Sequence, residues 1–144
     1  MGPMNKRIEE LAGLCRRHEI SALYAFGSRA EEVRDWIDGK LAYLSASDSD
    51  IDIGIHVTRV ENWPVNNKVN FAFALESFFK SSRVDLVILN EADPFLASGI
   101  VRGERLYARN EFEADEYDLY VLRRAGDLAP LERERIALLL GEPT

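Results

Sequence analysis

Apolar residues recur along this chain at two different spacings, which predict alternating helices and strands. From Met4 to about Glu19 they recur every three or four positions, as on one side of an amphipathic helix. The short apolar run Ser21–Phe26, which ends at Gly27-Ser28, predicts a buried strand. Residues 29–39 return to helical spacing, so we expect a second helix there.

The next segment, Asp50–Val57, alternates between apolar and polar residues. Because successive side chains of a strand point to opposite sides, this pattern predicts a strand with one buried and one polar face. The apolar face consists of Ile51, Ile53, Ile55 and Val57, and the opposite face carries Asp50, Asp52, Gly54 and His56. The apolar face would hold the polar side chains on a rigid element.

The remaining periodicity predicts more helices around a small sheet. We expect a helix from Pro64 to about Lys80, a strand over Arg83–Leu89, a short helix from Pro94 to about Arg102, an edge strand at Leu106-Tyr107, and helices over Phe112–Arg124 and Pro130–Leu140 that separate near Gly126-Asp127. This order indicates an α+β (α/β-like) fold with a small mixed β-sheet, flanking helices and C-terminal helices. We expect one domain over residues 1–110 and a C-terminal helical extension over residues 111–144 that packs on it.

Composition and charge narrow the classes of function. The 144 residues include 25 acidic and 18 basic ones, and the net charge of −7 argues against binding a nucleic-acid polymer, which needs a basic surface. A nucleotide remains compatible, because a divalent cation can offset its charge. The single cysteine, Cys15, lies on the apolar stripe of the first helix and is predicted to be a core residue. A single cysteine cannot form a disulfide within the chain, which favours a cytoplasmic protein. No apolar run approaches the ~20 residues needed to span a bilayer.

Two carboxylates form the strongest chemical signal. Asp50 and Asp52 lie two apart on the predicted strand, so both side chains point from the same face. Their repulsion destabilises the fold unless a cation or water relieves it, and Mg²⁺ is commonly held by one or two carboxylates with substrate phosphates. A solvated outer face is the alternative, and the pair alone fits either. An EF-hand loop starting at Asp48 is excluded, because Ile53 and Arg59 stand where it needs glycine and an acidic residue.

Two further features add to this pair. Asp85 lies within an apolar strand, where an unpartnered carboxylate is costly to bury, so it is a candidate third metal ligand. Its alternative role is to reach solvent or cap a neighbouring amide. Gly27-Ser28 joins a strand to a helix, where free amides, the Ser28 hydroxyl and the charge of Arg29 could bind phosphate. By itself this segment is equally typical of an ordinary turn.

Taken together, these motifs resemble those of the DNA-polymerase-β-like nucleotidyltransferase superfamily, in particular its minimal nucleotidyltransferase (MNT) branch. The motifs are Phe26-Gly27-Ser28-Arg29-Ala30, Ser49-Asp50-Ile51-Asp52-Ile53-Gly54 and Val84-Asp85-Leu86-Val87, and the similarity spans roughly residues 4–110. The resemblance implies a nucleotidyltransferase domain over residues 1–110. It also implies that Gly27, Ser28 and Arg29 bind the nucleotide, and that Asp50, Asp52 and Asp85 are catalytic residues that hold metal, with two Mg²⁺ ions and ATP as the substrate.

The resemblance further implies a partner. MNT proteins commonly act as antitoxins of HEPN toxins, and some attach AMP to a tyrosine of the toxin. We therefore expect AMP transfer to a tyrosine hydroxyl of a HEPN-type toxin, in a homo- or hetero-oligomer and without a membrane. Two alternatives stay open: a non-catalytic antitoxin that neutralises its partner by contact, and a nucleotidyltransferase acting on a small molecule.

Two segments are unusual for this family. Twenty-one residues separate Ser28 from Asp50, a longer gap than is usual in this family. The extra residues lie around Asp35–Ser47, and this segment is a candidate for covering the nucleotide or narrowing the choice of acceptor. Ile136–Leu140 is apolar on all sides, which is more than one core-facing stripe requires. It either packs fully on the domain or leaves a docking surface exposed.

Overall fold

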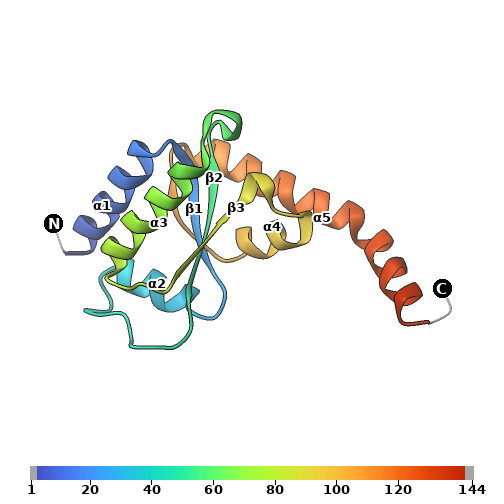
Figure 1. The fold of residues 1–144 in the computed structure, drawn as a ribbon, viewed down its shortest axis with the longest axis horizontal. Coiled ribbons are helices and arrows are strands. Elements are labelled where there is room, and N and C mark those ends of the chain that lie inside the picture. The colour runs from blue at the N-terminus through green and yellow to red at the C-terminus, as the bar shows by residue number, and fades with distance from the viewer. Residues whose placement is uncertain (1–2, 142–144) are drawn as a thin grey trace.

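The computed structural model describes residues 3–141 and confirms the predicted α+β fold (Figure 1). The elements are, in chain order, α1 (Pro3–Arg17), β1 (Ile20–Phe26), α2 (Ala30–Ile37), β2 (Ile51–Val57), the 3-10 helix η1 (Val60–Asn62), α3 (Val65–Phe79), β3 (Val84–Ile88), the 3-10 helix η2 (Leu89–Glu91), α4 (Pro94–Val101), β4 (Glu104–Ala108) and α5 (Glu111–Leu139). No helix in this part of the chain is long and apolar enough to cross a membrane.

The four strands form one mixed sheet in the order β3-β2-β1-β4. β1 is antiparallel to both of its neighbours, β2 and β4, whereas β2 and β3 run parallel. The parallel pair requires a crossover, which α3 supplies. The predicted strand near Leu106-Tyr107 is β4, at one edge of the sheet, and β3 forms the other edge.

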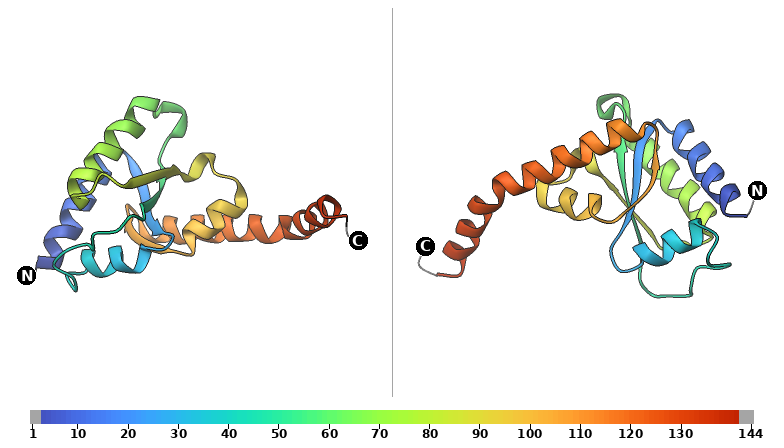
Figure 2. Two further views of the ribbon diagram at one scale, coloured as in Figure 1. Left: turned by 60° about the horizontal axis from the view of Figure 1, so that its bottom comes forward. Right: turned by 180° about the vertical axis from the view of Figure 1, so that it is seen from behind.

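Helices cover both faces of the sheet, as the two views of Figure 2 show. On one face α1, α2 and α3 pack against the apolar side of β2, and Cys15 is buried among them, as predicted. On the other face α4 and α5 pack against β1, around Tyr24, Ile100 and Val121. The polar face of β2 therefore lies in the same layer as α4 and α5.

The predicted break between two C-terminal helices is wrong, because α5 is one continuous helix from Glu111 to Leu139. Pro130 lies inside it and lacks the N–H that would bond to the carbonyl of Gly126. The missing bond and the crowding of that carbonyl by the proline ring bend the helix without ending it. The change of direction is visible in the last third of α5 in Figure 1.

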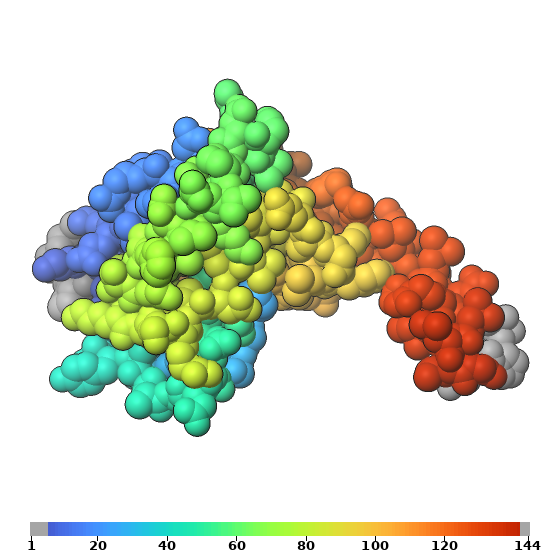
Figure 3. Space-filling view, viewed as in Figure 1, coloured from blue at the N-terminus to red at the C-terminus, as the bar shows by residue number. Residues whose placement is uncertain are grey.

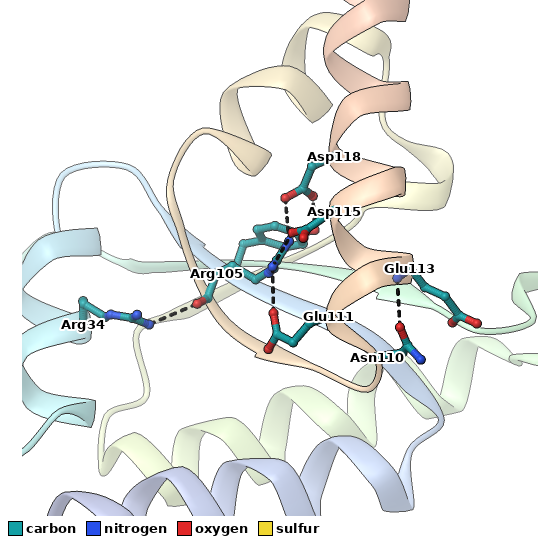
Figure 4. Close-up of polar contacts among 8 residues, drawn as sticks. Arg34, Arg105, Asn110, Glu111, Glu113, Asp115 and Asp118 are labelled. Atoms are coloured by element: carbon teal, nitrogen blue, oxygen red, sulfur yellow. Dashed lines mark hydrogen bonds and ion pairs between the residues drawn. The ribbon is translucent and has the colours of Figure 1, made fainter.

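The first half of α5 is fixed to the sheet by a charged cluster centred on Arg105 of β4 (Figure 4). The Arg105 guanidinium donates to Asp118 at 2.9 Å, Glu111 at 2.8 Å and Asp115 at 2.7 Å, all on α5. The Tyr24 hydroxyl of β1 donates to the same Asp118 carboxylate. These bonds join strands β1 and β4 to one helix.

The domain boundary at residue 110, between the predicted domain and its C-terminal extension, stays a prediction.

Candidate active site

The three predicted carboxylates come from the ends of the parallel strands β2 and β3. Asp52 and Asp85 are direct neighbours in the register of the two strands. Leu86 belongs to the core on the α1–α3 face, so Asp85, one position earlier, lies on the same side as Asp52. Asp50 precedes the first residue of β2 and is half exposed. The sheet thus brings two of the three carboxylates side by side from segments over thirty residues apart.

The charges of Asp85 and Asp50 act on Asp52. The pKa of Asp52 is raised above its ordinary value, first by partial burial, then by the charge of Asp85 and then by that of Asp50. A carboxylate in this position gains more from a bound cation than a solvated carboxylate would.

Asp50 has a partner that the sequence analysis did not foresee. Its Oδ1 lies 3.4 Å from Nε of Arg83, which directly precedes β3. The parallel register accounts for this contact, because the amide of Ile51 also donates to the carbonyl of Arg83 at 2.7 Å. Among residues 6–141, no three His, Cys, Asp or Glu side chains are grouped so that they could hold a metal ion as they stand. Asp50 would have to turn from Arg83 to join Asp52 and Asp85.

The turn after β1 lies directly against Asp52. Gly27 has a φ of 77°, in the left-handed region that favours glycine. A β-carbon built on Gly27 would lie 2.3 Å from Oδ2 of Asp52, closer than any real side chain could remain. Ser28 follows as an exposed residue two positions before the first residue of α2. The predicted phosphate-binding turn and the predicted metal-binding strand are therefore in contact.

Arg29 does not extend freely into solvent from this turn, because only 6% of its surface is exposed. Its Nε donates to Glu32 at 3.0 Å, and its two terminal nitrogens donate to the carbonyls of Ser45 at 2.8 Å and Ser49 at 3.2 Å. Both carbonyls belong to the long connection between α2 and β2. In this structure Arg29 therefore holds that connection in place, and its predicted role in binding nucleotide stays a prediction.

The same connection, residues 38–50, contains most of the predicted extra segment around Asp35–Ser47, whose first residues belong to α2. Arg7 of α1 fixes its beginning by donating to the carbonyls of Trp36 at 2.6 Å, Leu41 at 2.8 Å and Ala42 at 3.0 Å. The connection and the ends of α1 and α3 enclose a cleft of about 1030 Å³. Arg7 and Arg29 were not singled out for this role, because nothing in their spacing reveals contacts with carbonyls 16 to 35 residues away.

Two other residues on the polar face of β2 have structural partners. A β-carbon on Gly54 would meet Ile100 of α4 at 2.4 Å, so glycine lets that helix approach the sheet closely. The His56 ring stacks on Tyr117 of α5, with ring centroids 3.7 Å apart. Burial, and secondarily the charge of Arg109, lower the pKa of His56 to about 4, so the ring is neutral at pH 7. Both residues pack helices onto the face that carries Asp52.

The chain matches a known protein family over most of its length. The sequence model of the family described as polymerase beta, nucleotidyltransferase matches residues 9–112. This range contains Gly27, Ser28 and all three carboxylates. No curated protein gives a significant match to the chain.

Solved structures share the fold. A toxin-antitoxin complex with AMP-PNP matches with a TM-score of 0.69 and 19% identity, over 92% of this chain and 98% of the other. A tri-AMPylated HEPN toxin from Shewanella oneidensis in complex with MNT antitoxin matches with a TM-score of 0.66 and 18% identity, over 95% and 98%. A protein proposed to be a minimal nucleotidyltransferase matches with a TM-score of 0.52 and 25% identity, over 70% and 89%.

Proposed function

Because this chain belongs to the polymerase β nucleotidyltransferase family, we propose that it is a metal-dependent antitoxin that transfers AMP from ATP to a tyrosine hydroxyl of a HEPN-type toxin. The observation that carries the proposal is the contact between the Gly27 turn and Asp52, which is the direct neighbour of Asp85 across the two parallel strands. A phosphate-binding turn and acidic ligands must meet in this way if one nucleotide is to touch both.

The donor chemistry of the site fits Mg²⁺. All three candidate ligands are carboxylates, the hard oxygen donors that this ion prefers. The pKa of Asp52 is raised by burial first and then by the charges of Asp85 and Asp50, and a bound cation would offset both effects. Asp52 and Asp85 would hold the metal, and Asp50 would join them after exchanging its ion pair with Arg83. When bound, Mg²⁺ stabilises negative charge on the reacting phosphate oxygens.

In the proposed reaction, the acceptor hydroxyl oxygen forms a bond to the α-phosphorus of ATP. The bond between that phosphorus and the oxygen leading to the β-phosphate breaks, and pyrophosphate leaves with its electron pair. The backbone at Gly27 and the hydroxyl of Ser28 would position the β- and γ-phosphates. Asp85, exposed on the edge strand, would accept the proton of the acceptor hydroxyl. Positioning of this kind supplies much of the acceleration in phosphoryl-transfer enzymes.

The proposed acceptor rests on the structural neighbours. One of them is an AMPylated HEPN toxin with its MNT antitoxin, and another contains AMP-PNP. This supports ATP as the nucleotide and a HEPN-type protein as the acceptor. The 38–50 connection borders the turn through Arg29 and remains a candidate for covering the nucleotide.

Radiolabelled ATP and Mg²⁺ provide the decisive experiment, with the product of the adjacent gene as acceptor. We expect label on that protein and its loss in Asp50→Ala and Asp52→Ala. Asp127→Ala, an exposed position on α5, is the matched control and should transfer at the wild-type rate. Full transfer by both active-site variants would refute the metal site. Tight binding of the partner without any transfer would favour neutralisation by contact.

A further inference from the structure

The distal part of α5 exposes the apolar residues that the sequence analysis flagged. This part extends beyond the body of the protein, as the space-filling view shows (Figure 3). Leu131 is 63% exposed, Ile136 44% and Leu139 71%. Of the two possibilities raised by the sequence, full packing on the domain is wrong. Several large apolar side chains so exposed on one helix indicate a surface that another molecule covers.

These residues form part of one stripe along the helix. Its members recur at intervals of three or four residues and are Leu128, Leu131, Glu132, Arg135, Ile136 and Leu139. Residues at such spacing lie on the same side of a helix. Val121 and Ala125, which are buried against the domain, continue the same spacing toward the N-terminus. The distal stripe is thus the domain-packing face of α5, prolonged past the point where the domain ends.

We propose that a second copy of this chain covers the distal stripe, with the two α5 helices antiparallel and a twofold axis between Arg133 and Glu134. In that register each member of the stripe meets another member: Leu128 faces Leu139 of the second copy, Leu131 faces Ile136, and Glu132 faces Arg135. A surface that is its own complement is what a twofold interface requires.

The charges at the centre of the stripe favour this occupant. Within one helix Arg135 already pairs with Glu132, with Nη2 2.5 Å from Oε1. In the antiparallel pair, the two arginines and two glutamates alternate in sign around the axis. The Asp93 carboxylate is near enough to oppose ionisation of Glu132, although the hydrogen bond from Arg135 lowers the pKa of Glu132 overall.

A partner with a single sign of charge fits the stripe less well. It would attract one member of the Glu132–Arg135 pair and repel the other. A purely apolar partner helix would leave both charges without a new partner as it covered them. Only a surface with the opposite order of charges satisfies both, and the antiparallel copy has that order.

The oligomeric state of the full chain tests the proposal. One helix pair lies at the small end of stable interfaces, so we would measure mass by light scattering and sedimentation from about 1 µM to about 500 µM. We expect a monomer that converts to a dimer as concentration rises. Leu139→Asp should abolish the dimer. Ala137→Asp is the matched control, because Ala137 lies neither three nor four residues from any member of the stripe, so this variant should dimerise normally.

Charge reversal tests the register. Arg135→Glu places four glutamates around the axis and should weaken dimerisation at least tenfold, whereas the double variant Glu132→Arg/Arg135→Glu restores alternating charges and should recover it. Circular dichroism checks that α5 stays helical in each variant. The double variant Leu131→Cys/Ile136→Cys should form intermolecular disulfides on oxidation, since positions five apart on one helix cannot bridge to each other.

A chain that stays monomeric at every concentration would overturn the proposal. So would a dimer unaffected by Leu139→Asp and Arg135→Glu, because its interface would lie elsewhere. If the chain is monomeric but the partner toxin binds wild type and not Leu139→Asp, the stripe is covered by the toxin instead. None of these readouts depends on nucleotide transfer, so they stand apart from the proposed activity.

Discussion

A β-carbon at Gly27 would lie 2.3 Å from the carboxylate oxygen Oδ2 of Asp52, so the turn after β1 and the acidic strand β2 are in direct contact. This relationship couples the two halves of the candidate site. Any residue other than glycine at position 27 would displace the carboxylate that the site depends on.

Gly27→Ala should therefore lower both stability and activity. The left-handed φ costs a residue with a side chain about 1–2 kcal/mol, and the contact with Asp52 adds to this. Chemical denaturation and AMP transfer measure the two effects. Gly13→Ala is the control, because its new β-carbon meets nothing within 4 Å and its helical position favours alanine by about 0.5–1 kcal/mol. Equal stability of the two variants would contradict the close contact.

Asp52→Asn should stabilise the folded protein at pH 7 while lowering transfer by more than about a hundredfold. The pKa of Asp52 is raised in the folded state, by burial and then by Asp85 and Asp50. Above its ordinary pKa of 3.8 the native state therefore holds more protons than the unfolded chain, and stability falls as pH rises through the raised value.

Thermal unfolding at pH 7 and pH 3 measures this effect. The gain in Tm from Asp52→Asn should be present at pH 7 and absent at pH 3, where both folded and unfolded chains carry a neutral Asp52. Asp127→Asn, at an exposed position, should change neither value. A gain of the same size at both pH values would mean that packing, and not charge, is responsible.

Glu32→Gln should loosen the connection between α2 and β2. Glu32 accepts hydrogen bonds from Arg29, which lower its pKa from 4.5 to about 2, although burial opposes this shift. The stabilisation from the charged form is present above pH 4.5 and is lost as pH falls toward 2. We expect Glu32→Gln to cost about 1.5 kcal/mol at pH 7, typical of a hydrogen bond to a charged group.

Urea denaturation at pH 7 and near pH 2.5 tests this expectation, with Glu31→Gln as the control because Glu31 is an exposed neighbour on α2. The difference between wild type and Glu32→Gln should shrink at the lower pH. Hydrogen exchange at the amide of Ser45, which donates to Glu32, should quicken in the variant. Unchanged exchange there would show that Arg29 alone fixes the connection.

Tyr24→Phe should destabilise the junction between β1 and α5. The Tyr24 hydroxyl donates to Asp118, which is also held by Arg105 at 2.9 Å. Losing one donor to a partly buried carboxylate is expected to cost about 1–3 kcal/mol. Equilibrium unfolding measures the loss, and Tyr43→Phe, whose ring is highly exposed, should be neutral. If Tyr24→Phe leaves the free energy of unfolding unchanged, Arg105 alone is a sufficient partner for Asp118.

Local patterns in the sequence were sufficient for the four strands and for the polar face of β2. The alternation of Asp50–Val57 predicts both the buried isoleucines of β2 and the polar face that carries Asp52. The burial of Cys15 follows from its place on the stripe of α1. Such predictions succeed because side-chain direction within one element depends only on the geometry of the local backbone.

Contacts between distant segments depended on the tertiary structure. The ion pair of Asp50 with Arg83 arises from strand register, and Arg29 is turned toward Ser45 and Ser49 by the course of a long connection. Neither contact can be predicted from the spacing of residues along the sequence. Gly126 and Pro130 predicted a break, yet the helix continues because its surroundings there are open to solvent and allow it to bend.

The sequence by itself proposed which residues could carry the chemistry, and it determined the face of β2 on which Asp52 lies, since strand spacing sets the direction of each side chain. Only the tertiary structure decided which of them meet. It placed Asp85 beside Asp52, brought Gly27 into contact with Asp52, and left the distal stripe of α5 uncovered. The physical reason is that periodicity fixes directions within an element, whereas distances between elements follow from how the sheet and its helices pack.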